Sequence, residues 1–319
     1  MIPYQHLDHI LNTNHINRFA LAISGGPDSM AMAKLALQYQ KNHNSTIHGL
    51  IVDHQLREDS TQEARYVSKL CTGIGLANTI LTWDHPPLKT RLQEKARLAR
   101  YQLLSDWCKK NHYNYLLTAH HANDLLETFL MRLTKGSSLK GLCALKPIRT
   151  LYGIDIVRPF LNLTQKELQT ALQDQPYVSD PSNNNQQFER VRMRQWLAHM
   201  DIMTGFLRTY QKLQEADDLI NDLAFNFAQK HIHGQDIDLE PLLDLSPYLF
   251  IQIFKNYILE DNIADSAISN FRTNLIEKKI VTLNHKKFTY FEDENGKQKL
   301  RFTQIYQAGT HNHQSSFSE

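Results

Sequence analysis

The fold is decided by the stretch Phe19-Ala20-Leu21-Ala22-Ile23-Ser24-Gly25-Gly26-Pro27-Asp28-Ser29-Met30. An apolar run ends at Ser24, and an apolar pattern with helical spacing begins at Met30, which predicts a strand, a glycine loop and a helix. Adjacent glycines let backbone N–H groups turn inward, so the loop and the helix N-terminus would form an anion site. The loop is not a Walker loop, because no Gly-Lys-Ser/Thr follows it. An ordinary turn, with Asp28 or Ser29 as the helix cap, is the alternative that this stretch alone leaves open.

Length and composition indicate an ordinary globular protein. The 319 residues are about two domains' worth, and the net charge of +2 means that any nucleic-acid surface must be local. The three cysteines lie far apart and form no C-x-x-C pair, which argues against a disulfide scaffold, a zinc ribbon or an iron–sulfur clamp. No apolar signal core opens the sequence, and no run reaches ~18 apolar residues. We therefore expect a reduced, cytoplasmic setting.

Strand-like and helix-like segments alternate over the first two hundred residues. Crossover helices of this length imply parallel strand pairing, so the predicted fold class is α/β with a doubly wound, mostly parallel sheet. Ligands of such sheets bind beyond the carboxyl ends of the strands. Strands are predicted at 20–23, 47–52, 79–83 and 115–118, and helices at 29–40, 60–73, 89–110 and 121–134.

The second part of the chain has a different pattern. A less regular region, 135–187, precedes a pattern that becomes helical at Arg190 and stays so to about Lys279. Strands around the turn Glu294-Asn295-Gly296 end this part. Helices are predicted at 202–231, 246–260 and 264–278, with strands within 280–302. The predicted organisation is a catalytic domain at 1–200, a mainly helical domain at 201–308 that ends in a short β segment, and a disordered tail at 309–319.

Asp124 and Glu127 form the first candidate site. They lie three residues apart on a predicted helix, away from its apolar face, and can point toward the strand ends. Two carboxylates beside a phosphate site can hold an ammonium ion or Mg²⁺, and a solvated acidic helix face is the alternative. His120 and His121 precede them. Their spacing gives no zinc set, so a histidine that donates to a phosphate or to a leaving oxygen fits better.

Three further candidate sites lie elsewhere in the sequence. Arg97 and Arg100 are three apart in a predicted helix and can face one anion. Asp53 ends the second predicted strand, where a doubly wound fold commonly borders the base or ribose of a nucleotide. Solvated helix flanks and a polar loop are the alternatives. A compact basic patch that suits an RNA phosphate backbone consists of Arg190, Arg192 and Arg194, and Arg158 would extend it.

In their shared order these motifs resemble the N-type ATP pyrophosphatase family, whose loop reads Ser-Gly-Gly-x-Asp-Ser and which has an adenine nucleotide alpha hydrolase-like fold. Within that family the chain is similar to the tRNA(Ile)-lysidine synthases over about residues 18–195. It departs from their pattern at Gln55, where a glycine is usual, and at Leu125, where a glutamine is usual. The matches are Ser24–Ser29, Val52–Arg57, Ala96–Tyr101, Thr118–His121, Asp124, Glu127-Thr128, Gly136-Ser137, Leu139–Leu142, Arg158-Pro159 and Asp180–Asn183 with the arginines that follow.

The resemblance implies a two-step reaction. ATP adenylates the C2 oxygen of the wobble cytidine, position 34, in tRNA(Ile) with a CAU anticodon. The ε-amine of L-lysine then attacks C2 and AMP leaves, which gives lysidine. The implied cofactors are ATP and Mg²⁺, without a resident protein metal site, and a homodimer is one implied assembly. The implied catalytic residues are Asp28, Arg100, His121, Asp124 and Glu127. Those for ATP are Ser24, Gly25, Gly26, Pro27, Asp28, Ser29, Asp53 and His120, and those for tRNA are Arg158, Arg190, Arg192 and Arg194.

Three rival functions stay open. A tRNA 2-thiolation enzyme of the same superfamily would need cluster ligands or a catalytic cysteine, for which only Cys143, after Gly141-Leu142, is worth a test. An amidotransferase-type synthetase would need a glutaminase domain or partner, and the basic segment favours RNA instead. A non-catalytic RNA-binding protein would not need the intact loop and the carboxylates.

Overall fold

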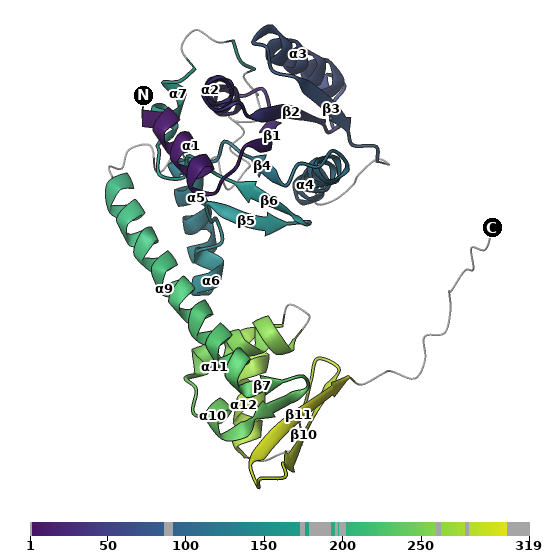
Figure 1. Cartoon of the computed structure of the whole chain (residues 1–319), viewed down its shortest axis with the longest axis vertical. Coiled ribbons are helices and arrows are strands. Elements are labelled where there is room, and N and C mark those ends of the chain that lie inside the picture. Colours follow the sequence, from purple (N-terminus) through teal and green to yellow (C-terminus); the bar gives the residue numbers. More distant parts are fainter. Residues whose placement is uncertain are drawn as a thin grey trace, which may run out of the picture. The chain divides into compact units, whose positions relative to one another are not determined.

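The computed structural model describes residues 2–85, 92–172, 176–178, 193, 194, 197, 202–259, 263–277 and 281–304. The chain divides into two compact units, Met1–Lys212 and Leu213–Glu319 (Figure 1). Within the described ranges, no helix combines the length and the apolar character needed to cross a membrane. The predicted boundary at 200/201 and the predicted tail at 309–319 lie outside the described residues.

A six-stranded sheet forms the centre of the first unit. Its order is β3-β2-β1-β4-β6-β5, and all neighbouring pairs are parallel except β5 with β6. This arrangement confirms the predicted α/β class. The strands are β1 (Arg18–Ile23), β2 (Thr46–Asp53), β3 (Asn78–Thr82), β4 (Tyr115–Leu117), β5 (Ile148–Leu151) and β6 (Ile154–Val157).

The hairpin of β5 and β6 lies in a region that the sequence predicted to be irregular. Its two turn residues, Tyr152 and Gly153, both have positive φ, at 50° and 76°. Two-residue hairpin turns of this kind are usually Asn-Gly or Asp-Gly, so a Tyr-Gly turn gives a weak signal in the sequence.

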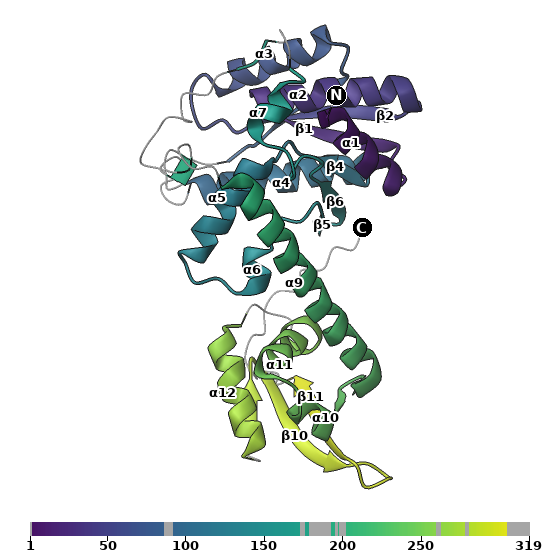
Figure 2. The same cartoon turned by 90° about the vertical axis from the view of Figure 1, so that its left-hand side faces the viewer.

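Helices cover both faces of the sheet, as Figures 1 and 2 show. The first face carries α1 (Ile2–Thr13), α2 (Pro27–His43), α3 (Ser60–Gly73) and α7 (Gln165–Gln169), and the other carries α4 (Leu92–Lys110). After Arg18, strand β1 is apolar because Phe19, Leu21 and Ile23 pack on one face and Ala20 and Ala22 on the other. Helix α1 was not predicted, although Leu7 and Leu11 are fully buried.

The strand order places the two main motifs together. The sheet grows from β1 through β2 to β3 on one side and from β4 through β6 on the other, so β1 and β4 flank the topological switch point. The loop 24–26 leaves the carboxyl end of β1 for α2. Residues 118–121 connect the carboxyl end of β4 to α5 (Ala122–Leu133), which is followed by α6 (Leu139–Leu142).

The second unit has its own core, built on a five-stranded antiparallel sheet of order β7-β8-β11-β10-β9. Helix α9 (Met203–His231) begins in the first unit and ends in the second. The hairpin of β7 and β8 corrects the prediction of helix up to Lys279, and Gly234 turns it with a φ of 64°. The other elements are β7 (Ile232–His233), β8 (Asp236–Asp238), α10 (Leu239–Leu243), α11 (Pro247–Ile253), the π-helical turn η2 (Phe254–Ile258), α12 (Asp265–Ile276), β9 (Val281–Leu283), β10 (Lys286–Glu292) and β11 (Gln298–Gln304).

Candidate active site

The loop after β1 is a compact turn that opens helix α2. Gly25 has a φ of +82°, and a Cβ on it would lie 2.3 Å from Cγ2 of Val67. Gly26 is the N-cap of α2, and no side chain caps this end of the helix. Neither Asp28 nor Ser29 is therefore the N-cap of this helix. The first N–H groups of the helix therefore lack side-chain acceptors and can bind an anion.

The side chain of Ser29 holds this loop closed. Its hydroxyl donates to the carbonyl oxygen of Gly26 at 2.9 Å and accepts from the backbone N–H of Ser24 at 3.3 Å. The backbone N–H of Val178 donates to the carbonyl oxygen of Gly25 at 2.9 Å. Ser29 is buried whereas Ser24 is exposed, so the open side of the loop is at Ser24.

Asp28 is fixed by two glutamines that the sequence did not single out. The side-chain amides of Gln165 and Gln169 donate to its two carboxylate oxygens at 3.1 and 2.8 Å. The backbone N–H of Gln165 in turn donates to Oδ1 of Asn123 at 2.9 Å, which connects α7 to α5. The capping box of Thr164 and Glu167 predicts the start of a helix here, with the glutamines four residues apart on one face. That signal could have found them.

His121 lies between two carboxylates. Its Nε2 is 3.6 Å from Oδ2 of Asp28 and 3.5 Å from Oδ2 of Asp124, and its side chain is almost fully buried. Its backbone N–H also donates to Oδ2 of Asp124 at 3.1 Å. Asp28 is on the β1 side of the switch point and Asp124 on the β4 side. The structure thus brings three of the predicted site residues into one cluster.

Burial and charge oppose each other in this cluster. Burial alone would lower the pKa of His121, but the hydrogen bond with Asp28 and the charges of Asp124, Asp28 and Glu127 outweigh it and raise that pKa. Burial alone would raise the pKa of Asp28, but hydrogen bonds from His121, Gln169 and Gln165 outweigh it and lower that pKa. The pair is therefore most stable as an imidazolium beside a carboxylate.

Glu127 is buried and paired with an arginine. Nε and Nη2 of Arg194 donate to its two oxygens at 2.7 and 3.3 Å, and only 1% of the Glu127 side chain is exposed. The hydrogen bond with Glu127 raises the pKa of Arg194 against the effect of burial. Arg194 was predicted to bind tRNA, and in this structure it lies at a predicted catalytic carboxylate. Its predicted neighbours Arg190 and Arg192 lie outside the described residues.

Asp53 organises the loop after β2. It is 2% exposed and accepts from the backbone N–H of Gln55 at 3.1 Å and from the hydroxyl of Thr61 at 2.7 Å. Gln55 has a φ of 50°, so it occupies the left-handed conformation that glycine adopts most easily. The family that this chain resembles usually has glycine at this position, and the positive φ explains that preference. Both oxygens of Asp53 serve the loop, so its backbone neighbours are better placed than its carboxylate to contact a nucleotide.

Arg97 and Arg100 converge on Tyr101. Their guanidinium carbons lie 5.3 and 5.7 Å from the centre of its ring. Arg158 lies near the same tyrosine but is only 5% exposed, and its Nη1 donates to the carbonyl oxygen of Lys146 at 2.8 Å. Burial lowers the pKa of Arg158, and the nearby Tyr101 opposes this. Such deep burial does not fit the predicted contact between Arg158 and RNA.

The remaining predicted residues lie at the carboxyl end of β4. The hydroxyl of Thr118 and Nδ1 of His120 form a hydrogen bond of 2.8 Å. Leu125, at the position where a glutamine is usual, is buried with Leu145, Leu161 and Tyr210. Core packing thus replaces the polar side chain of the usual glutamine, which explains how the departure is tolerated.

The site combines an anion cradle with a buried acidic cluster. An ATP phosphate chain fits the uncapped N-terminus of α2, and a Cβ at Gly25 would disrupt that loop. In the part of the chain that the structure describes, no group of three or more His, Cys, Asp or Glu side chains is arranged to hold a metal ion by itself. A Mg²⁺ ion would therefore depend on ATP phosphates for most of its ligands, as is usual for this cation.

Sequence comparison relates the chain to known proteins. A family model described as a PP-loop domain matches residues 3–200. The tRNA(Ile)-lysidine synthase of Zymomonas mobilis is 31% identical over 291 residues, which cover 86% of each chain. That of Orientia tsutsugamushi is 37% identical over 185 residues, 57% of this chain and 42% of the relative. That of Methylobacterium nodulans is 40% identical over 196 residues, which cover 61% of this chain and 57% of the relative. The chain thus spans about half the length of two of these three relatives.

A solved structure shares the fold. The U34-tRNA thiolase NcsA from Methanococcus maripaludis, determined with its [4Fe-4S] cluster, aligns with a TM-score of 0.54 at 18% sequence identity. The alignment covers 62% of this chain and 72% of the thiolase. At this identity the likeness establishes the architecture of the sheet and its helices only.

Proposed function

The chain belongs to the tRNA(Ile)-lysidine synthase family of PP-loop proteins, and we propose that it is an ATP-dependent ligase that joins L-lysine to a tRNA. The proposed substrate is tRNA(Ile) with a CAU anticodon, and the products are lysidine at the wobble position, AMP and pyrophosphate. The reaction would take place in the cytoplasm.

One observation carries the proposal. Asp28, which follows the glycine loop, and Asp124, which follows β4, contact the same imidazole of His121 at 3.6 and 3.5 Å. An anion cradle and a carboxylate cluster therefore share one edge of the sheet. This is the arrangement needed to bring a nucleotide phosphate and an amine to one reacting atom.

The first step is adenylation of the base. The C2 oxygen of the cytidine attacks the α-phosphorus of ATP, the bond to the bridging oxygen breaks, and pyrophosphate leaves. The N–H groups at the start of α2 would hold the departing phosphates, and Mg²⁺ bound to them would neutralise charge. Arg100 and Arg97 lie on α4 beside Tyr101, and we propose that they face the adenylate or the carboxylate of lysine.

The second step is attack by lysine. The ε-amine must lose a proton before it can attack C2, after which the bond between C2 and the adenylate oxygen breaks and AMP leaves. Asp28, Asp124 and Glu127 would bind the ammonium form, and the lowered pKa of Asp28 would keep its carboxylate ionised for this contact. The proton that the amine loses would pass to a carboxylate of this cluster. His121 links Asp28 to Asp124 and provides a path for that proton. His120 would contact phosphate.

The tRNA would contact basic residues beyond the carboxylates. Arg190, Arg192 and Arg194 are proposed for this role, and Arg158 is left out because it is buried. We propose that residues 1–200 act as the catalytic domain and that the mainly helical region 201–308 grips the tRNA. A homodimer is the proposed assembly.

The direct test is nucleoside mass spectrometry. An unmodified tRNA(Ile) transcript with a CAU anticodon is incubated with the protein, ATP·Mg²⁺ and L-lysine, then digested. The expected product is a cytidine–lysine adduct that requires all three substrates. A transcript that stays unmodified while a known lysidine synthase modifies it in the same buffer would refute the proposal.

The cysteines do not favour the rival thiolation chemistry. All three are buried. Burial raises the pKa of Cys71 to about 11 and that of Cys108 to about 12, so neither thiol is poised to react at neutral pH. Cys143 is fully buried in the region between α6 and β5.

A further inference from the structure

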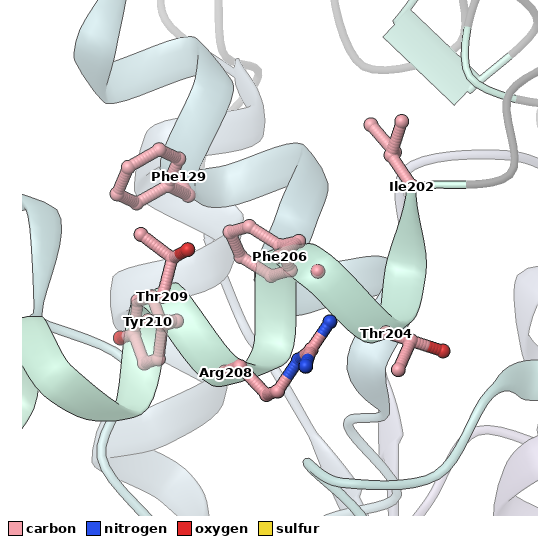
Figure 3. A pocket seen from close by; sticks show the side chains of 8 residues that line it. Phe129, Ile202, Thr204, Phe206, Arg208, Thr209 and Tyr210 are labelled. Carbon is pink, nitrogen blue, oxygen red and sulfur yellow. The ribbon is translucent and has the colours of Figure 1, made fainter.

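A groove opens on the first unit (Figure 3). It has a volume of about 630 Å³ and lies between α5 and the first two turns of α9. Phe129 comes from α5, and Phe206, Arg208 and Tyr210 come from α9. None of these residues takes part in the reaction as derived above.

Aromatic rings form one side of the groove. Phe206 packs against Phe129 with ring centres 5.3 Å apart and against Tyr210 with ring centres 5.6 Å apart. Tyr210 is buried and supports the cluster, whereas Phe129 and Phe206 stay partly exposed. A rigid ring that is held from behind and open in front is a stacking platform for a planar ligand.

The lining of the groove carries a positive charge. Of the eight described residues that line it, Arg208 is exposed and none is acidic. The groove therefore suits an anionic ligand.

The groove and the carboxylate cluster share helix α5. Phe129 follows Glu127 by two residues, which places the two side chains about 200° apart around the helix axis, on opposite sides of α5. A ligand in this groove would thus contact the other side of α5 from Glu127.

We propose that this groove binds an unstacked nucleobase of the RNA substrate. The base would stack on Phe206, which Phe129 supports edge-on, and Arg208 would contact a flanking phosphate. Proteins commonly read single-stranded RNA loops through aromatic stacking and arginine contacts of this kind. The inference rests on the proposed function because it takes the ligand to be the tRNA substrate.

Two variants separate stacking from charge. Phe206→Leu keeps apolar volume but loses the ring, and it should weaken binding of the tRNA(Ile) transcript roughly 5- to 150-fold, since stacking contributes about 1–3 kcal/mol per base. The slope of log Kd against log salt should stay unchanged. Arg208→Ala should also weaken binding, but it should reduce that slope by about 0.7, as expected for one phosphate contact with a single strand. Phe206→Tyr keeps the ring and should bind like the wild type.

Matched controls come from α3, which contributes nothing to the groove. Tyr66 and Arg65 are exposed there, so Tyr66→Leu and Arg65→Ala remove the same kinds of group elsewhere on the first unit. Both control proteins should bind the transcript like the wild type. Thermal unfolding of every variant checks that the Phe206 cluster stays folded. ATP binding, measured by calorimetry, should be unaffected in all of them.

Measuring RNA affinity separately from lysine-adduct formation distinguishes this inference from the proposed function. Failure of the wild type to form the lysine adduct, with groove variants that still lower RNA affinity, would refute the function and leave the groove standing. Wild-type activity with groove variants that bind and turn over tRNA normally would overturn the groove. Equal losses of affinity for a fully paired RNA duplex would also overturn it, because a duplex offers no unstacked base.

Discussion

Replacing Gly25 by alanine should destabilise the glycine loop by two separate effects. The φ of +82° forces a non-glycine residue into a strained conformation, at a cost of about 1–2 kcal/mol. The new Cβ would lie 2.3 Å from Cγ2 of Val67, which is 3% exposed in the core, and such overpacking costs about 1–3 kcal/mol. Gly25→Ala should therefore lower the free energy of unfolding by about 2–5 kcal/mol.

Urea unfolding of the whole protein measures this cost, and Gly26→Ala is the matched control. Gly26 has a φ of −69°, and the nearest atom to its added Cβ would be Oγ of Ser24 at 3.6 Å. Its stability should change by less than about 1 kcal/mol, because the N-cap and entropy effects of alanine oppose each other. Gly26→Ala should instead weaken ATP binding, since its methyl group enters the anion cradle.

A double variant tests the cause. Val67→Ala removes Cγ2 and leaves Cβ at 3.4 Å from the new methyl group, an ordinary contact. In the Gly25→Ala background it should therefore cost about 1–3 kcal/mol less than it does alone. Strictly additive losses, or a Gly25→Ala protein as stable as Gly26→Ala, would refute the steric reasoning.

The other predictions concern charge and the loop after β2. Asp28→Asn should fold normally but lose at least ~100-fold in lysidine formation, and near-normal turnover would remove Asp28 from the mechanism. Glu127→Gln should raise the KM for lysine with little change in the Kd for ATP, and an unchanged lysine KM would contradict its role. The stability advantage of the wild type over His121→Asn should be full below pH 6.5 and should disappear as the pH rises through the raised pKa of His121, and a pH-independent difference in urea unfolding would contradict this. Gln55→Gly should change stability by less than about 1 kcal/mol, since relief of the left-handed strain offsets the added chain entropy, and a large loss in urea unfolding would show that its side chain matters.

Local chemistry made much of this protein readable from its sequence. The strand, loop and helix around Gly25 follow from an apolar run, two glycines and helical spacing, each of which acts over a few residues. The first four strands and most helices were predicted within a few residues for the same reason. The helix α1 and the hairpins β5–β6 and β7–β8 were missed, because they are short or polar and depend on packing against distant strands.

Contacts between distant segments were decided by the tertiary structure alone. His121 reaches Asp28 because β4 lies next to β1, and no local pattern encodes that neighbour relation. Gln165 and Gln169 bind Asp28 across 137 and 141 residues of sequence. Arg158 is basic in the sequence but buried in the fold, which only the packing of β6 against α4 reveals. Residue type and spacing thus determined which groups are available for chemistry, whereas strand order and burial determined which of them meet.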